Sequence, residues 1–440
     1  MLEKLTSFQK LQPSFRQSYL DRWSAVAGKE TSLEAFASLD ASLQALGPTD
    51  DERLFFAINL KEKGNPGLAK YIMASLTDRA EPHVGALYES GLLSIIDSYR
   101  GGCDYLLSAI SQLNTFDPAI RSLFFAAILR GDSETLERLR TMADPEIIRR
   151  YEISHAAFIK YLASIGPTLP WRTDENAGLF DLCDISILPQ EAVARLLADG
   201  KSNLLRIGDG EGAMFMFDMA EELEFASLYG PVRSHMTRRW MGCEYEEIVR
   251  PVFGWQQAIS DSLSQIDILG CPDRRWMLKT LIDGDARCFV SLLNGWRRIA
   301  ALRPTMRPDV AFTTTSIVYD LLYHGSLAPL LSGTGRMSIV SWHDLHRPDG
   351  FGALGEMRFL MIPPAASDVE ALGLTDKAMS VEAAIGLPDR IVEKTVEGET
   401  VVICGGYVAK TAAGRLIAGG RRVLDFGSAP EMILVGRPVR

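Results

Sequence analysis

The sequence has 440 residues and a formal net charge of −10. At about 150 residues per domain, this length predicts two or three domains. Apolar residues make up 47% of the chain and charged residues 23%, which is the composition of an ordinary globular protein. The negative charge argues against bulk electrostatic binding of nucleic acid or of an anionic membrane, although a local basic patch can still bind phosphate groups.

The spacing of the cysteines and the length of the apolar runs indicate the cellular compartment to expect. The six cysteines are scattered, with no CxxC pair, which argues against a zinc cage or a disulfide framework and favours a reducing compartment. No run approaches the roughly 18 apolar residues of a membrane span, and the first residues lack the apolar stretch of a secretory signal. We therefore expect a cytoplasmic protein without a transmembrane segment.

Residues 1–165 are predicted to form helix after helix. The apolar segments 54–60 and 123–129 echo each other, and each runs into a basic residue and a glycine. That ending is typical of a helix C-terminus. The echo is similar to the stacked helical hairpins of TPR-like repeats, and an irregular helical bundle is the alternative. Both interpretations predict an all-α N-terminal domain.

The pattern changes after residues 166–184, which contain two prolines close together and are interpreted as a linker or arm. From residue 185 to residue 440, helices alternate with short apolar strands. Unbroken apolar strands between helices predict an α/β domain with a mostly parallel sheet covered on both faces. Ligands of such sheets bind beyond the carboxyl ends of the strands. The predicted strands are 204–207, 287–290, 310–313, 337–340, 358–362, 400–404 and 422–425.

The first candidate site is the turn Gly208-Asp209-Gly210-Glu211, which follows the first predicted strand. Glycines let a backbone turn tightly and approach a ligand closely. Asp209 and Glu211 are hard oxygen ligands that can face Mg²⁺ or Mn²⁺. The alternative is a turn whose carboxylates only cap the following helix.

A second candidate site begins where another predicted strand runs into Gly405 and Gly406. Backbone N–H groups at the start of the next helix favour an anion, and Lys410 adds a positive charge near a phosphate. The alternative is an ordinary turn with a solvated lysine. Asp425 then ends the last predicted strand.

Hydroxyl groups gather after a third strand, where Thr314 and Thr315 can bind sugar or phosphate oxygens. An ordinary helix N-cap is the alternative. His343 and His346 follow a fourth strand. They can act as a base or as metal ligands. Two histidines without a third ligand are weak evidence for a metal.

A basic patch lies in this acidic chain, where it can face a diphosphate or an anionic acceptor. A solvated helix face is the alternative. Its members are Arg233, His235, Arg238 and Arg239.

Three of these motifs, in this order, resemble those of GT-D-type glycosyltransferases over residues 185–440. The motifs are a strand followed by a GDGE turn, a strand followed by GGxxAK, and a strand ending in Asp-x-Gly. They are carried by Arg206 to Glu211, by Cys404 to Lys410, and by Asp425 to Gly427.

The resemblance implies a Rossmann-like fold and transfer of a sugar from a nucleotide-sugar donor, UDP-linked in the first instance. Asp209 and Glu211 would then serve the Mn²⁺ or Mg²⁺ ion and the donor diphosphate. A divalent ion stabilises the charge that develops on the leaving nucleotide, and glycine turns supply backbone donors to the same group. The donor-binding residues implied or expected are Arg206, Gly208, Gly210, Thr314, Thr315, Gly405, Gly406, Tyr407, Lys410 and Asp425.

The chain departs from the family pattern after Asp-x-Gly. Members of the family often continue with a histidine and acidic residues, whereas Ser428-Ala429-Pro430-Glu431 follows here. Glu431 and His343 are therefore the candidate catalytic bases. Inversion at the anomeric carbon is the simpler expectation from the resemblance.

The leading hypothesis is thus a metal-dependent glycosyltransferase of bacterial type acting on a glycan or protein acceptor. Its helical region would bind the acceptor or mediate assembly into a homo-oligomer. A non-catalytic scaffold that keeps the nucleotide-sugar fold and acts through its helices is the alternative. A nucleotide-dependent transferase or phosphohydrolase that is not specific for sugars is the third. The sequence lacks the G-x-S-x-G turn of hydrolases.

Overall fold

A computed structural model describes residues 34, 37, 38, 41, 44, 45, 48–62, 66–323, 331, 335–342, 356–372 and 378–427. The chain divides into two compact units, Met1–Asp181 and Leu182–Arg440. Within the described residues, no helix combines the length and the apolar character needed to cross a membrane.

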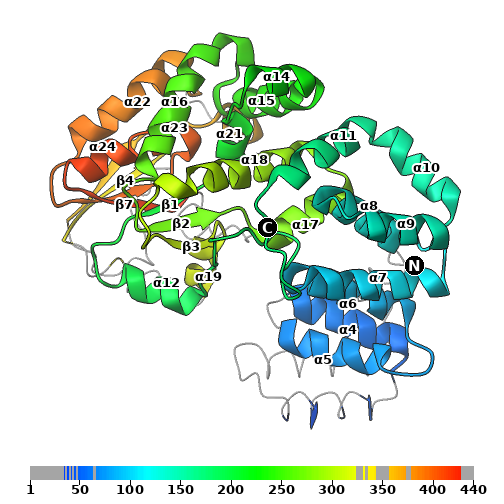
Figure 1. Ribbon diagram of the computed structural model, residues 1–440. Helices are drawn as coiled ribbons and strands as arrows, with labels where there is room; N and C mark the ends of the chain where they lie inside the picture. The colour runs from blue at the N-terminus through cyan, green and yellow to red at the C-terminus, as the bar shows by residue number, and fades with distance from the viewer. Residues whose placement is uncertain are drawn as a thin grey trace. The chain divides into compact units, whose positions relative to one another are not determined.

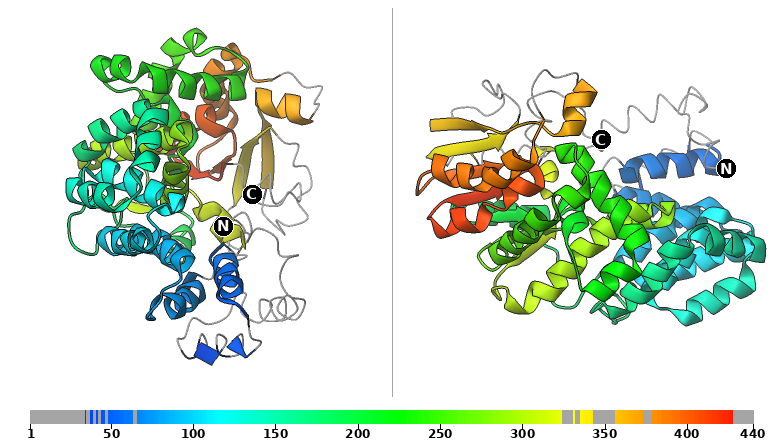
Figure 2. Two further views of the ribbon diagram at one scale, coloured as in Figure 1. Left: turned by 90° about the vertical axis from the view of Figure 1, so that its right-hand side faces the viewer. Right: turned by 90° about the horizontal axis from the view of Figure 1, so that it is seen from above.

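The described part of the first unit consists of helices, which succeed one another in chain order (Figures 1 and 2). Consecutive helices from α4 to α9 pack together, as do α10 and α11, and α8 also contacts α10 and α11. The helices are α4 (Asp50–Glu62), α5 (Pro66–Thr77), α6 (Val84–Asp97), α7 (Tyr99–Gln112), α8 (Asp117–Arg130), α9 (Ser133–Met142), α10 (Pro145–Ser154) and α11 (Ala156–Ile165).

The apolar segment 123–129 lies in α8 and explains its central place in this unit. Every residue from Ser122 to Leu129 is buried. The helix begins with Asp117 and a proline in its first turn, and ends at Gly131, whose φ of 66° is left-handed. The predicted helix end at the arginine and glycine is confirmed.

The second unit is built on one sheet of seven strands, and all its strand pairs are parallel. The strand order is β3-β2-β1-β7-β6-β4-β5. The strands are β1 (Leu204–Arg206), β2 (Ile268–Cys271), β3 (Ala311–Thr314), β4 (Arg336–Ser341), β5 (Glu356–Met361), β6 (Thr400–Ile403) and β7 (Arg422–Asp425). The predicted α/β class with a parallel sheet is confirmed.

Helices cover both faces of this sheet (Figure 1). On one face, α12 and α19 pack onto apolar strand residues such as Leu204, Ile339 and Val402. On the other face, α18, α23 and α24 contact β2, β6 and β7. The helices of the unit are α12 (Gln190–Leu197), α13 (Asp209–Met214), α14 (Met219–Glu224), α15 (Ala226–Met241), α16 (Val249–Ser262), α17 (Arg274–Asp283), α18 (Ala286–Leu302), α19 (Ile317–Tyr323), α21 (Ala366–Leu372), α22 (Val381–Lys394), α23 (Gly406–Lys410) and α24 (Ala413–Ala418).

One predicted strand is wrong and another was missed. Residues 287–290 lie in α18 because the Asp285 side chain accepts a hydrogen bond from the Cys288 amide and caps the helix. Strand β2 was not predicted, since its residues Ile-Leu-Gly-Cys are few and include a glycine, which is depleted in strands.

The strand order indicates where a ligand is expected to bind. Strands β2 and β3 follow β1 on one side of it, and the chain then crosses to the other side to build β4 to β7. The order therefore reverses between the neighbours β1 and β7, and open parallel sheets bind ligands beyond the strand ends at such a point.

Candidate active site

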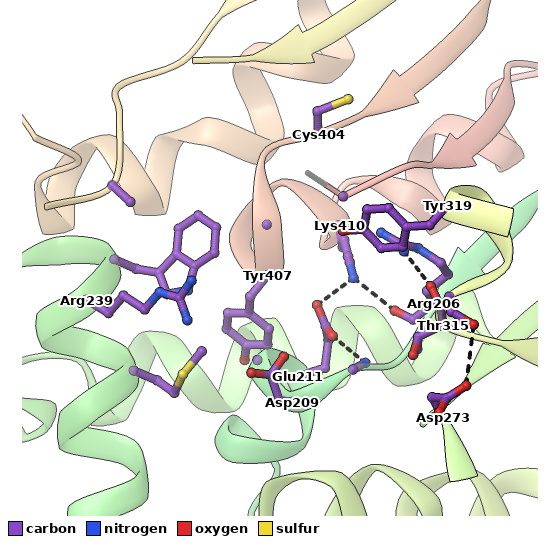
Figure 3. Close-up of a pocket in the computed structure, with 18 of the residues that line it drawn as sticks. Arg206, Asp209, Glu211, Arg239, Asp273, Thr315, Tyr319, Cys404, Tyr407 and Lys410 are labelled. Carbon is purple, nitrogen blue, oxygen red and sulfur yellow. Dashed lines mark hydrogen bonds and ion pairs between the residues drawn. The ribbon is translucent and has the colours of Figure 1, made fainter. Parts of the chain in front are cut away.

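A cavity of about 720 Å³ opens at the carboxyl ends of the strands, with the β1–β7 pair in its floor. Its volume lies within the usual range of small-molecule sites. Residues that follow β1, β2, β3, β4, β6 and β7 line it, and helices α15 and α21 complete its wall. The lining includes Arg206, Asp209, Glu211, Arg239, Trp240, Asp273, Trp276, Thr315, Tyr319, Trp342, Asp368, Tyr407 and Lys410 (Figure 3).

The turn after β1 gives its two carboxylates different surroundings. The amide of Gly208 donates to Glu211 Oε2 over 2.7 Å, which closes the first turn of α13. The other Glu211 oxygen, Oε1, lies 2.7 Å from Lys410 Nζ, and the Glu211 side chain is only 5% exposed. Both Glu211 oxygens are therefore occupied by donors of the protein.

Asp209 is the carboxylate of this turn that stays open. It is half-buried and lines the cavity, and only backbone amides of its own turn, those of Asp209 and Gly210, hydrogen-bond to it. Among the described residues, no other side chain forms a hydrogen bond or ion pair with it. Burial and the charge of Glu211 raise the pKa of the Asp209 carboxyl, while Arg239 partly opposes the shift. A cationic ligand at Asp209 would relieve this unfavourable negative charge.

Lys410 joins the two halves of the sheet below the cavity. Its Nζ lies 2.7 Å from Glu211 Oε1 and 2.9 Å from Asp425 Oδ2, and it donates to the Arg206 carbonyl over 3.0 Å. The Lys410 side chain is 6% exposed and that of Asp425 is fully buried. Although burial opposes the shift, the charges of Asp425 and Glu211 raise the pKa of Lys410. The lysine therefore stays charged.

Arg206 completes a buried cluster of four charges, Arg206, Glu211, Lys410 and Asp425. The amide of Arg206 donates to Asp425 Oδ2 over 3.0 Å, and its guanidinium lies 3.4 Å from Oδ1. Its NH1 group also donates to the carbonyl of Thr315 over 2.7 Å, which ties β1 to the end of β3. The two positive charges and the two negative charges of this cluster neutralise each other.

The turn after β1 also packs very closely onto α18, and this makes a prediction about stability. A Cβ atom at Gly212 would lie 1.8 Å from the Ser291 carbonyl oxygen, which belongs to the backbone. We expect Gly212→Ala to lower the free energy of unfolding by about 1–3 kcal/mol, measured by denaturant titration, because α13 and α18 must separate.

Gly210 is the matched control in the same helix. A Cβ atom there would meet Met236 Cε at 3.4 Å, an ordinary contact. Because alanine is a better helix former than glycine, Gly210→Ala should leave stability unchanged or slightly raised. Equal stability of both variants would contradict the close-packing argument.

The second glycine motif builds another wall of the cavity. Gly406 begins α23 with a left-handed φ of 65°, and a Cβ there would lie 2.2 Å from Trp240 Cη2. Gly406, Tyr407 and Lys410 line the cavity, whereas a Cβ at Gly405 would meet Ile362 and Ala409. This motif therefore holds the Trp240 ring close to the backbone as well as supplying Lys410.

The hydroxyl groups that follow β3 lie next to Asp273, an acidic residue that follows β2. Thr315 and Ser316 line the cavity, and Thr314 Oγ1 lies 2.7 Å from Ser316 Oγ behind them. Ser316 also donates to Asp273 Oδ2 over 3.4 Å, and Asp273 caps α17 through the Trp276 amide. This side of the cavity offers polar groups with the exposed Trp276 ring beside them.

The predicted basic patch divides into two parts. Arg233 is buried and pairs with Glu222, and its guanidinium lies over the rings of Tyr229 and Tyr245. It therefore stabilises the helices. His235, Arg238 and Arg239 are exposed on α15, and Arg239 lines the cavity.

The remaining site predictions divide by position. Asp425 lies under the cavity, in the buried cluster, while Gly208 and Gly210 line it. His343, His346 and Glu431 lie outside the described residues. Within the described part of the chain, no group of three or more His, Cys, Asp or Glu side chains is placed to hold a metal by itself.

The sequence reasoning missed several lining residues, notably Trp240, Asp273, Trp276 and Tyr319. Asp273 and Trp276 follow β2, and the signal that places them is the carboxyl end of that strand. Trp240 and Tyr319 lie on helices and carry no motif.

Comparison with known proteins gives likenesses of fold. No protein-family model matches the chain, and no curated protein matches it. It is similar to a solved structure of domain of unknown function 1792, described as having a distinct glycosyltransferase fold. The identity is 16%, over 57% of this chain and 83% of that chain, with a TM-score of 0.35. A second similar structure is described as a new glycosyltransferase with this domain from Streptococcus sanguinis. Here the identity is 17%, over 57% and 85%, with a TM-score of 0.32.

Proposed function

We propose that the second unit is a metal-assisted glycosyltransferase that uses a nucleoside diphosphate sugar. The observation that carries the proposal is the open carboxylate of Asp209 beside a buried cluster whose charges cancel. A diphosphate entering this cavity meets Asp209 and two further acids, Asp273 and Asp368. Because all these groups are negatively charged, a cation is needed between the diphosphate and the carboxylates. The motif resemblance noted in the sequence supports the same reaction class.

The side chains present fit a divalent ion that is shared with the donor. Mg²⁺ commonly binds one or two carboxylates, substrate phosphates and several waters, without a cage made only of protein groups. Asp209 supplies such a carboxylate, with an unfavourable charge that a cation would neutralise. Glu211, engaged by Lys410 and the Gly208 amide, would hold the turn in place. Bound Mn²⁺ or Mg²⁺ would supply stabilisation of the negative charge on the leaving diphosphate.

The transfer itself exchanges one bond for another. The oxygen of an acceptor hydroxyl forms a bond to the anomeric carbon of the sugar. The bond between that carbon and the diphosphate oxygen breaks, and its electron pair leaves on the diphosphate. The proton of the hydroxyl goes to a base, for which Glu431 and His343 remain the sequence-based candidates.

The other lining residues have parts in donor binding. Arg239 has no ion-pair partner among the described residues and is the cation free to meet a diphosphate oxygen. The hydroxyls of Thr315 and Ser316 suit ribose or sugar oxygens, and the aromatic rings of Trp276 and Tyr319 suit the flat face of a base. UDP is the first nucleotide to test.

The test is a thermal-shift panel of UDP-, GDP- and dTDP-sugars with and without Mn²⁺, followed by assays for free nucleotide and transferred sugar. A donor that binds only the folded state raises Tm by mass action. We expect at least one donor to raise Tm with metal and lose the shift in excess chelator. No shift with any donor would overturn the proposal and favour the scaffold function. Release of sugar phosphate in place of transferred or free sugar would favour a phosphohydrolase.

A further inference from the structure

Asp273 lines the cavity one strand away from Asp209. In the register of the parallel pair, Arg206 of β1 lies opposite Gly270 of β2. Asp209 follows Arg206 by three residues, and Asp273 follows Gly270 by three. Because neighbouring strands lie about 4.8 Å apart, the two acids leave the sheet at the same level from adjacent strands.

The carboxylate of Asp273 is only partly used by the protein. Its Oδ1 accepts a hydrogen bond from the Trp276 amide over 2.9 Å, and its Oδ2 accepts one from the Ser316 hydroxyl over a long 3.4 Å. Within the described part of the chain, no lysine or arginine forms an ion pair with Asp273. A carboxylate has about four acceptor sites, so about two remain. Asp273 can therefore accept two further hydrogen bonds from a ligand.

The groups around Asp273 follow the order of the parts of a nucleotide. Figure 3 shows Asp209 between Arg239 on one side and Asp273 on the other. Trp276 lies three residues beyond Asp273 and lines the same cavity, and at 38% exposure its ring can take a stacked base. A nucleotide presents its diphosphate, then its ribose and then its base. With the diphosphate at Asp209, the ribose lies at Asp273 and the base at Trp276.

Thr315 adds a second polar group at this strand end. Its amide donates to the Cys271 carbonyl over 2.7 Å, which holds it against the end of β2, two residues before Asp273. Its side chain is half-buried and lines the cavity, and none of the described residues hydrogen-bonds to its hydroxyl. Ribose hydroxyls both donate and accept hydrogen bonds, so a carboxylate and a hydroxyl at one strand end suit them.

We propose that Asp273 binds the 2′- and 3′-hydroxyls of the donor ribose and makes the protein selective for ribonucleoside diphosphate sugars over their 2′-deoxy forms. The inference deepens the proposed glycosyltransferase function and rests on it. Each hydroxyl donates to one free acceptor site of the carboxylate, which is thereby turned toward hydroxyls and away from the diphosphate. A 2′-deoxyribose removes one of these hydrogen bonds and offers no donor in its place.

Matched nucleotides test this selectivity directly. The probes are UDP against 2′-deoxy-UDP, and GDP against 2′-deoxy-GDP, each titrated with Mn²⁺ into the full chain by calorimetry. We expect the ribonucleotide of at least one pair to bind about 10- to 100-fold more tightly than its deoxy partner. This factor corresponds to one hydrogen bond to a charged group.

Variants at Asp273 separate ribose binding from support of the fold. Serine and asparagine are good N-cap residues, so Asp273→Ser and Asp273→Asn keep α17 capped. In both variants the affinity for the ribonucleotide should fall to that for the deoxy form, while the affinity for the deoxy form changes little. A residue that only holds the fold would weaken both nucleotides equally, so the change in their ratio is specific to the ribose contact.

Asp285→Asn is the matched control. Asp285 caps α18 through the Cys288 amide, as Asp273 caps α17, but it does not line the cavity. The preference for the ribonucleotide should therefore be unchanged in this variant.

Three results would overturn the proposal. They are equal affinities within both nucleotide pairs, a ribose preference that survives in Asp273→Ser, and an equal loss of affinity for both members of a pair in the Asp273 variants. Sugar transfer with no discrimination between ribose and deoxyribose donors would contradict this inference alone. A ribose preference without sugar transfer would contradict the glycosyltransferase proposal alone. Failure of every nucleotide to bind would overturn both.

Discussion

Lys410→Met is expected to lower the free energy of unfolding of the second unit by about 3–5 kcal/mol, the usual cost of removing one partner from a buried ion pair. Methionine fills a similar volume but leaves Glu211 without its cation and Asp425 with Arg206 alone. Both carboxylates are buried, so water does not replace the lysine. Denaturant titration followed by tryptophan fluorescence measures the loss.

A second substitution distinguishes the lost charge from lost packing. Adding Glu211→Gln to Lys410→Met removes the stranded charge and should recover part of the stability, a coupling that a double-mutant cycle measures. Lys279→Ala is the control, because its pair with Asp283 is exposed and worth less than about 1 kcal/mol. If Lys410→Met lost as little stability as Lys279→Ala, the buried cluster would be contradicted.

The pH dependence of stability has a definite sign at Asp425. Although burial opposes the shift, Lys410 and Arg206 lower the pKa of this carboxyl in the folded state. Between the folded and the unfolded pKa of Asp425, the unfolded chain therefore binds more protons than the folded chain. The contribution of Asp425 to the free energy of unfolding is fully present above its unfolded pKa. It is lost as the pH falls through the folded pKa. In Lys410→Met, this loss should begin at a higher pH.

Asp209→Asn is expected to reduce glycosyl transfer by about 10²- to 10⁴-fold while leaving the fold intact. The several kcal/mol that a metal contributes to a developing charge correspond to that range, and asparagine is a poor ligand for the ion. Stability should stay equal or rise, since the ionised carboxylate is disfavoured by burial and by Glu211. Donor turnover and denaturant titration measure the two effects.

The control for Asp209 is Asp283→Asn, which removes an exposed carboxylate outside the cavity and should leave transfer unchanged. An Asp209→Asn enzyme that retains most of its activity would remove this carboxylate from the metal site. A variant that loses activity together with stability would show that Asp209 supports the fold. Loss of activity at full stability would distinguish Asp209 from Lys410, since removal of Lys410 affects both activity and stability.

Local patterns were enough to predict most of the sheet. Segments such as 337–340 and 422–425 are short apolar runs between helices, and they form β4 and β7. Segment 287–290 has the same local character, but the capping of α18 by Asp285 overrides it. The order of strands was not readable, because parallel pairing joins segments far apart in the chain.

The site was predictable in its positions and less so in its partners. Asp209 and Glu211 were expected to act together, since they share a turn. The structure separates them, because Lys410 lies 2.7 Å from Glu211 and belongs to a distant segment. Spacing along the chain gives no information on such a contact. Trp240 likewise lies against Gly406 of a distant segment, where a Cβ atom would come within 2.2 Å of its ring.

The pairing of β1 with β7 has a consequence for how the protein is made. The bond between the Arg206 amide and Asp425 joins residues separated by 219 positions. During synthesis, β1 emerges long before β7, so its edge next to β7 stays unpaired until β7 has also left the ribosome. Contacts over such separations form slowly, and an unpaired strand edge favours aggregation in the meantime. The floor of the cavity therefore cannot form until β7 has been made.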